Sequence, residues 1–187
     1  MRGRGWGFAI TAVPVAALIA LMAWALTQSG GNPGGIGVND EFGEVSITTG
    51  PAPPLSLPLV NGGSIDLAEL RGKVVMIDFW SSWCPPCIEE APVLAEVYRE
   101  YAGQELEFLG VAIWDEADDI DRYIRQFDLS YPNGLDARGA VAINYGVRGI
   151  PEKYFIDREG QLVRKFSGPV SAEELRAIID AMLGPGS

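Results

Sequence analysis

Two cysteines separated by two prolines set the strongest limit on the fold of this chain. Cys84 and Cys87 are its only cysteines, within the segment WSSWCPPCIEEAP. The run KVVMIDFW just before them is almost entirely apolar, which is typical of a strand buried on both faces. A helix is expected from near Cys84 toward Tyr101, with Pro85 and Pro86 in its first turn, where N–H groups have no partner within the helix. The thiols are therefore predicted at a strand–helix turn.

The composition excludes several classes of site. The 187 residues contain no histidine, which removes histidine metal sites and both Ser–His and Cys–His catalysis. Two cysteines are too few for a disulfide framework or a four-cysteine zinc site. Ile88 follows the second cysteine, so the chain lacks the C-x-x-C-H sequence of haem attachment. We therefore expect no cofactor and no metal.

Residues 1–26 are predicted to contain a transmembrane anchor. Arg2 and Arg4 precede an uncharged run from Trp6 to Leu26, which at about 1.5 Å per residue is long enough to cross a bilayer. The arginines predict a cytoplasmic N-terminus and an extracytoplasmic remainder. A cleaved signal peptide is the alternative, because the sequence Ala23-Trp24-Ala25 offers small residues near a possible cleavage position.

Residues 27–51 are rich in glycine and small polar residues and are predicted to be a flexible linker. Residues 52–187 are predicted to form one globular domain. The net charge of the whole chain is −11, so nucleic acid and anionic membrane surfaces are poor partners. The acidic residues are interpreted as a solvated surface rather than as a patch for basic clients.

Strand and helix patterns alternate along the domain. A β-hairpin is expected around Asn61-Gly62-Gly63, a buried strand over residues 107–114, helices over residues 117–127 and 139–145, a strand–turn–strand around Arg158-Glu159-Gly160, and a final helix from Ser171 with Glu174 completing a capping box. This order predicts an α/β fold whose sheet is partly parallel and partly antiparallel.

The spacing of the cysteines predicts redox chemistry. With Cys84 as the helix N-cap, its sulfur lies near the backbone N–H of Cys87, and the helix terminus favours its thiolate. Cys87 lies within disulfide reach, so Cys84 is predicted to be the nucleophile and Cys87 the resolving thiol. The alternatives are a static disulfide, which would be a weak constraint in so short a loop, a pair of buried thiols, or Cu(I) binding. Because Cys84 follows a strand end, we expect it to be exposed.

The segment DFWSSWCPPC resembles the active-site segment of thioredoxin-fold proteins. The similarity continues in APPLSLPLVNGGSIDLAELRG upstream and INYGVRGIPEKYFIDREGQLVRKFSGPVS downstream. Together these segments resemble the membrane-anchored, extracytoplasmic thioredoxin-like reductases of the TlpA, ResA and CcmG/DsbE group, over roughly residues 52–184. The resemblance implies a thioredoxin fold with an N-terminal β-hairpin extension. The stretch GVRGIPEKYFID is most similar to the cytochrome c maturation branch.

The resemblance also implies roles for individual residues. Cys84 and Cys87 match the redox pair, and Pro151 matches the cis-proline that faces it. A cis-proline lacks an N–H, so the preceding backbone would be free to bind an extended client. The client-binding surface is accordingly expected at Trp83, Pro85, Pro86, Gly149 and Ile150. Lys153 is a departure, because many relatives have threonine in this position.

Two carboxylates are candidates for proton transfer. Asp78 matches the buried carboxylate of thioredoxin, and its apolar neighbours Ile77 and Phe79 predict desolvation. Glu90 lies three residues after Cys87 and shares its helix face. It also occupies the position of the active-site glutamate in ResA-like relatives, so we expect it to raise the cysteine pKa values. Glu89 is interpreted as a charge that interacts favourably with the helix dipole.

The resemblance implies a function as well. It predicts a single-pass membrane protein whose extracytoplasmic domain reduces disulfides in apocytochrome c. A membrane electron donor of the CcdA/DsbD type would reduce it again. A broader disulfide reductase, a disulfide-forming oxidant, and a non-catalytic thioredoxin-fold module that binds metal or clients remain alternatives.

Overall fold

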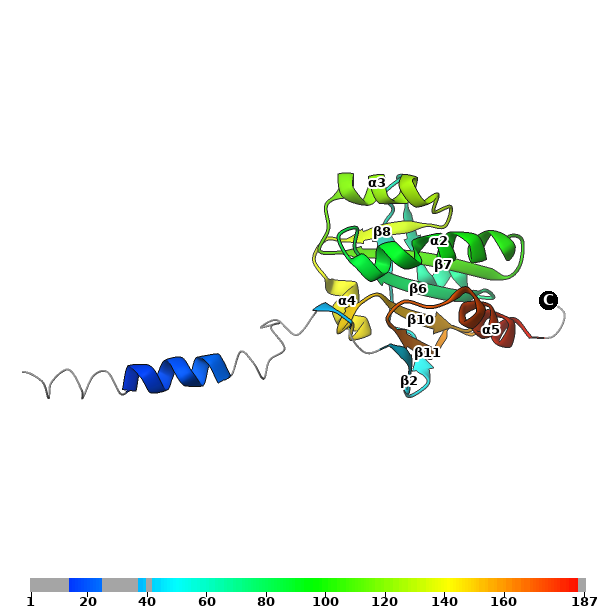
Figure 1. Ribbon diagram of the computed structural model, residues 1–187. Coiled ribbons are helices and arrows are strands. Elements are labelled where there is room, and N and C mark those ends of the chain that lie inside the picture. The colour runs from blue at the N-terminus through cyan, green and yellow to red at the C-terminus, as the bar shows by residue number, and fades with distance from the viewer. Residues whose placement is uncertain (1–13, 25–36, 40–41, 185–187) are drawn as a thin grey trace, which may run out of the picture. The chain divides into compact units, whose positions relative to one another are not determined.

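The computed structural model describes residues 14–24, 37–39 and 42–184 (Figure 1). Residues 1–36 and 37–187 form separate units. In the first unit, a helix covers residues 14–24 and its side chains are exposed. None of the helices within the described ranges is long and apolar enough to cross a membrane. Both ends of the predicted anchor, residues 1–13 and 25–26, lie outside the described residues.

The second unit is built around a mixed sheet of seven strands in the order β2-β11-β10-β6-β7-β8, with β3 also paired to β11. Strands β6, β7 and β8 run parallel, whereas β10 is antiparallel to both β6 and β11. In chain order the elements are β1 (Gly37–Val38), β2 (Gly43–Val45), β3 (Gly50–Pro51), β4 (Ser56–Pro58), β5 (Ser64–Asp66), the 3-10 helix η1 (Leu67–Leu70), β6 (Val74–Trp80), α2 (Pro85–Glu100), β7 (Leu106–Ile113), α3 (Ala117–Phe127), β8 (Asn133–Asp136), α4 (Ala140–Tyr145), β9 (Gly149–Ile150), β10 (Glu152–Ile156), β11 (Gln161–Ser167) and α5 (Ala172–Leu183).

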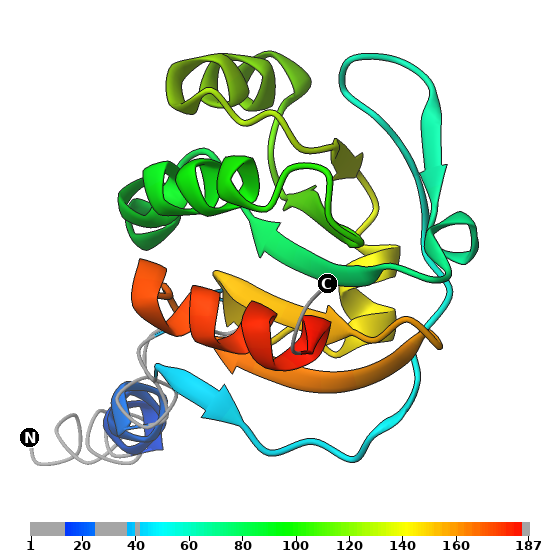
Figure 2. The same ribbon diagram turned by 90° about the vertical axis from the view of Figure 1, so that its right-hand side faces the viewer.

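Helices cover both faces of this sheet. Figure 2 shows α2, α3 and α5 on one face and α4 with the β4–β5 hairpin on the other. All seven residues of β6 are buried, as predicted for a central strand. Because side chains alternate along a strand, Phe79 faces α4, where its ring lies 5.6 Å from that of Tyr145. Asp78 therefore faces α2, and its partner in the register of the neighbouring strand is Lys153.

Most of the predicted elements are present. The helix over residues 117–127 has the predicted bounds, the β4–β5 hairpin encloses the Asn-Gly-Gly turn, and the last helix carries the predicted capping box of Ser171 and Glu174. The thioredoxin fold with its mixed sheet is thus confirmed. Strand β8 was not predicted; Asn133, Gly134 and Asp136 interrupt any apolar pattern there, and its pairing with β7 places it in the sheet.

The predicted linker is wrong in its C-terminal part. Residues 43–45 and 50–51 form β2 and β3, and both pair with β11. These strands have too few apolar residues to be recognised by alternation. They form because β11 otherwise presents an unpaired edge, whose backbone groups need hydrogen-bond partners. The globular unit therefore begins before residue 52.

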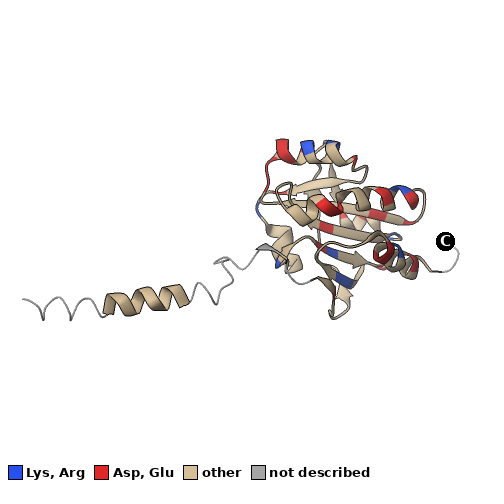
Figure 3. Cartoon of the chain, in the orientation of Figure 1, with Lys and Arg blue, Asp and Glu red and all other residues tan. Residues whose placement is uncertain are grey.

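Acidic and basic residues are interspersed along α2, α3 and α5 (Figure 3). On α3, Arg122 pairs with Asp119 and Arg125 pairs with Asp121. On α5, Arg176 pairs with Glu96 and Glu100 of α2. Exposed pairs of this kind contribute little to stability. The arrangement agrees with the interpretation of the acidic residues as a solvated surface.

Candidate active site

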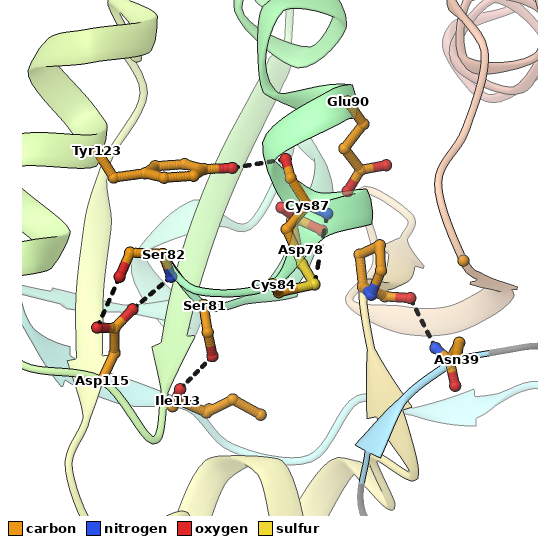
Figure 4. The surroundings of a disulfide bond; sticks show 12 residues. Asn39, Asp78, Ser81, Ser82, Cys84, Cys87, Glu90, Ile113, Asp115 and Tyr123 are labelled. Atoms are coloured by element: carbon orange, nitrogen blue, oxygen red, sulfur yellow. Dashed lines mark hydrogen bonds between the residues drawn. A yellow bond between two sulfur atoms is a disulfide. The ribbon is translucent and has the colours of Figure 1, made fainter.

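Hydrogen bonds join the turn between β6 and α2 to the end of β7 and the turn that follows it. The Ser82 hydroxyl donates to Asp115 Oδ1 at 2.9 Å, and Asp115 also accepts from the Ser82 backbone N–H. The Ser81 hydroxyl donates to the carbonyl of Ile113, and Trp83 Nε1 donates to the carbonyl of Trp114 at 2.9 Å. These bonds, most of them visible in Figure 4, hold the cysteine turn at the carboxyl ends of two parallel strands.

The two cysteines occupy the start of α2 as predicted and are joined by a disulfide. Cys84 is the N-cap, and the backbone N–H of Cys87 lies 3.4 Å from Cys84 Sγ (Figure 4). Pro85 and Pro86 occupy the first two helical positions, where their missing N–H groups cost nothing. The backbone N–H of Cys87 is available to stabilise a thiolate on Cys84 after reduction.

The predicted exposure of Cys84 is wrong. Its exposed fraction is 0%, although the flanking side chains Trp83 and Ile88 are 50% and 38% exposed. Ser81 is hydrogen-bonded to Ile113 at the end of β7 and Ser82 to Asp115 in the loop that follows, and these bonds hold the turn close to the sheet. Trp80 is buried and stacks on Tyr123 at 4.3 Å.

The loop before β10 contains the predicted cis bond between Ile150 and Pro151. Strand β1 pairs in parallel with β9, so residues 37 and 38 lie alongside Gly149 and Ile150. The Asn39 backbone N–H donates to the carbonyl of Ile150 at 3.0 Å, and its side-chain amide donates to the carbonyl of Pro151 at 2.8 Å (Figure 4). The backbone that was expected to bind a client therefore already carries a strand from the same chain.

A buried charged cluster lies on the α2 side of the sheet. Glu90, Asp78 and Lys153 are 3%, 2% and 0% exposed. The Lys153 ammonium contacts both carboxylate oxygens of Glu90 and lies 3.5 Å from Asp78 Oδ1. Glu90 Oε2 also accepts from the backbone N–H of Val170 at 3.1 Å. Asp78 Oδ1 makes no hydrogen bond with any described residue.

Burial raises the pKa of both carboxyls. Desolvation raises the pKa of Glu90 to about 7, although Lys153 acts in the opposite direction. Desolvation likewise raises the pKa of Asp78, with Lys153 again opposing it. The predicted burial of Asp78 is confirmed, and Glu90, on the redox helix itself, can hold a proton near neutral pH.

The structure brings most of the predicted site residues together around the disulfide. Asp78, Glu90 and Pro151 are buried on the elements next to Cys84 and Cys87, whereas Glu89 is exposed. Two residues of this site, Lys153 and Asp115, were not predicted as site residues. Lys153 was noted only as a departure from relatives, although a lysine inside the apolar stretch KYFID is itself a signal of a buried pair. Asp115, which holds the cysteine turn, gave no recognisable sequence signal.

Among the described residues no group of three or more histidine, cysteine, aspartate or glutamate side chains is placed to hold a metal ion.

The Tyr123 hydroxyl donates to the carbonyl of Cys87 at 2.6 Å and links α3 to the redox turn. The chemistry that this arrangement supports is exchange between the dithiol and a disulfide, with nearby carboxyls to exchange protons.

Comparisons with known proteins agree with this geometry. The model of the AhpC/TSA family matches residues 48–165. The thiol-disulfide oxidoreductase ResA of Bacillus thuringiensis subsp. konkukian (strain 97-27) is 31% identical over 125 residues, which cover 66% of this chain and 72% of that protein. ResA of Bacillus subtilis (strain 168) is 29% identical over 145 residues, covering 77% of this chain and 80% of that protein.

Solved structures of disulfide oxidoreductases are also similar to this chain. A putative thiol:disulfide interchange protein DsbE from Chlorobium tepidum matches with a TM-score of 0.68 and 30% identity, over 74% of this chain and 100% of that one. A secreted Mycobacterium tuberculosis disulfide oxidoreductase homologous to E. coli DsbE matches with a TM-score of 0.62 and 27% identity, over 68% and 95%. The chain therefore belongs to the thioredoxin-like AhpC/TSA family and is a thiol-disulfide oxidoreductase of the ResA/DsbE type.

Proposed function

We propose that this oxidoreductase reduces disulfides in extended segments of client proteins, and that apocytochrome c is such a client. The main support is the strand edge at Gly149–Ile150, which lies next to the cis-proline and pairs with residues 37–38. A client segment that replaces residues 37–38 at this edge would be held by the same backbone groups, near the redox turn. The choice of apocytochrome c rests on the resemblance of GVRGIPEKYFID to the maturation branch and on relatives named ResA and DsbE.

In this function the redox domain lies on the outer face of the cytoplasmic membrane. The supporting pattern is the uncharged run from Trp6 to Leu26 after Arg2 and Arg4. A membrane donor of the CcdA/DsbD type would then return the Cys84–Cys87 disulfide to the dithiol after each turnover. If the protein is a reductant, its reduction potential is expected to be about −270 mV; a disulfide-forming oxidant would have a potential of about −120 mV.

Freeing the strand edge should strengthen binding of a peptide client. Asn39→Pro removes both hydrogen bonds that Asn39 donates to the proline loop. These bonds help to hold residues 37–39 at the edge that a client would occupy, and each contributes on the order of 1 kcal/mol. Their loss should weaken this competition, so the KM for a peptide disulfide is expected to fall up to about fivefold per bond, with kcat unchanged. Steady-state kinetics measures both constants.

Two controls accompany that measurement. Asn39→Ala removes only the side-chain bond and should give a smaller decrease in KM. Hydroxyethyl disulfide has no peptide backbone to pair, so its KM should not change in either variant. A peptide KM that stays constant or rises in Asn39→Pro would show that clients do not use this edge.

Loss of the protein should appear as a shortage of holocytochrome c. A deletion strain without a paralogue is expected to lose most of its haem-stained cytochrome c, because haem attachment requires reduced cysteines. Expression of the wild-type chain, or addition of a small-molecule thiol, should restore it, whereas Cys84→Ser should not. Normal holocytochrome c in the deletion strain would remove this client and leave the exchange chemistry in place.

A further inference from the structure

Lys153 is the one basic side chain that contacts both carboxyls of the buried cluster among the described residues. It comes from β10, Asp78 comes from β6 and Glu90 comes from α2. Its ammonium contacts both oxygens of Glu90, donates to the carbonyl of Gly168 at 3.2 Å, and lies 3.5 Å from Asp78 Oδ1. The side chain has an exposed fraction of 0%. Its charge is therefore compensated by these protein groups.

Charge balance limits the number of protons in this cluster. If both carboxyls were ionised beside one ammonium, a net negative charge would be buried, and a buried uncompensated charge is costly. With one proton shared between Asp78 and Glu90, the cluster is neutral. Without the ammonium, neutrality would require both carboxyls to be protonated. Lys153 thus determines whether one carboxylate persists in this site at neutral pH.

We propose that Lys153 is a positioning residue for thiol–disulfide exchange, which keeps one of these two carboxyls ionised as a base for the Cys87 thiol. After a client disulfide has joined to Cys84, Cys87 must lose its proton before it attacks Cys84 Sγ. The carboxylate takes that proton, the Cys84–Cys87 bond forms, and the client leaves as a thiolate that is protonated by water. The dithiol is oxidised by two electrons and the client disulfide is reduced by two.

The other groups around Lys153 do not replace this function. Tyr123 of α3 and Tyr131, which precedes β8, have pKa values raised above their usual range by burial and by the two carboxylates, so both remain neutral. The thiols of α2 are the groups that react. On the opposite face of the strand pair, Glu152 pairs with Lys165 at 2.8 Å. The inference rests on the exchange chemistry and not on the identity of the client.

Lys153→Met should slow the resolving step at neutral pH. Without the ammonium the cluster is neutral only when both carboxyls are protonated, so the pKa of Glu90, about 7 in the wild type, is expected to rise. A rise of about one pH unit or more lowers the amount of carboxylate at neutral pH several-fold, and resolution is expected to slow by about the same factor. The deficit should disappear as the pH rises. Rapid mixing with a peptide disulfide and acid quenching measures the mixed disulfide, and carbon NMR of the Asp and Glu carboxyls measures the midpoint.

Lys165→Met is the matched control, because it removes a lysine from a buried ion pair on the other face of β10 and β11. It should retain the wild-type pH profile even where stability falls. Lys153→Gln provides a second neutral variant if Lys153→Met does not fold, with the same upward shift expected. An unchanged midpoint in the neutral variants, an equal shift in Lys165→Met, or wild-type carboxyls that titrate only below pH 5 would overturn the proposal.

Discussion

Cys84→Ser is expected to lower the rate of disulfide exchange by on the order of 10³-fold or more, since loss of a nucleophile costs at least this much in enzymes. The thiolate is the attacking species, and the Cys87 N–H at 3.4 Å from Cys84 Sγ is placed to stabilise that form. Serine at this position does not ionise near neutral pH. Reduction of a peptide disulfide under pseudo-first-order conditions measures the loss.

Cys87→Ser should behave differently, because it retains the nucleophile and lacks the resolving thiol. A mixed disulfide with the client is expected to accumulate on Cys84 and to be visible by non-reducing electrophoresis and mass spectrometry. Matched substitutions of Ser81 and Ser82 by alanine test the turn without altering either thiol. If the mixed disulfide instead accumulates on Cys87 in the Cys84→Ser variant, the assignment of the two thiols is reversed.

The sequence predicted those elements whose patterns are local. Three elements can be recognised from a stretch of about ten residues: β6 from its continuous apolar run, α3 from its amphipathic spacing, and the start of α5 from the Ser171 capping box. Strands β1, β2 and β3 were not predicted because their residues are few and mostly polar or glycine. They are set by the backbone groups that β9 and β11 leave unpaired, and this information lies more than a hundred residues away in the chain.

The same distinction applies to the site. The N-cap position of Cys84 and the helical spacing from Cys87 to Glu90 are local, and both are present in the structure. The position of Lys153 opposite Asp78 depends on the register between β6 and β10, which no local pattern specifies. The turn that carries Cys84 is held by hydrogen bonds to the end of β7 and to the loop after it, about thirty residues away in the chain. Contacts of this kind decide the electrostatics of the site, although the reacting atoms are evident from spacing alone.

Glu90 should make the oxidised protein less stable as the pH rises. Its pKa is about 7 in the folded protein and 4.5 in the reference state, so the folded protein binds a proton more tightly. The resulting stabilisation is fully present below pH 4.5 and is lost as the pH rises through 7. Between pH 5 and pH 8 this group alone should lower the free energy of unfolding by roughly 2 to 3 kcal/mol. Denaturant titrations at the two pH values measure the difference.

Glu90→Gln is expected to remove most of that pH dependence. The variant cannot bind the proton, and Lys153 then pairs with Asp78 alone, which favours the ionised form of that carboxyl. The oxidised protein is the appropriate state, since its cysteines do not titrate. Glu89→Gln is the matched control, because the exposed neighbour lies outside the buried cluster and its loss should leave the pH dependence intact. Equal pH dependence in both variants would show that the Glu90 carboxyl is ionised throughout this range, because Lys153 then outweighs the cost of burial.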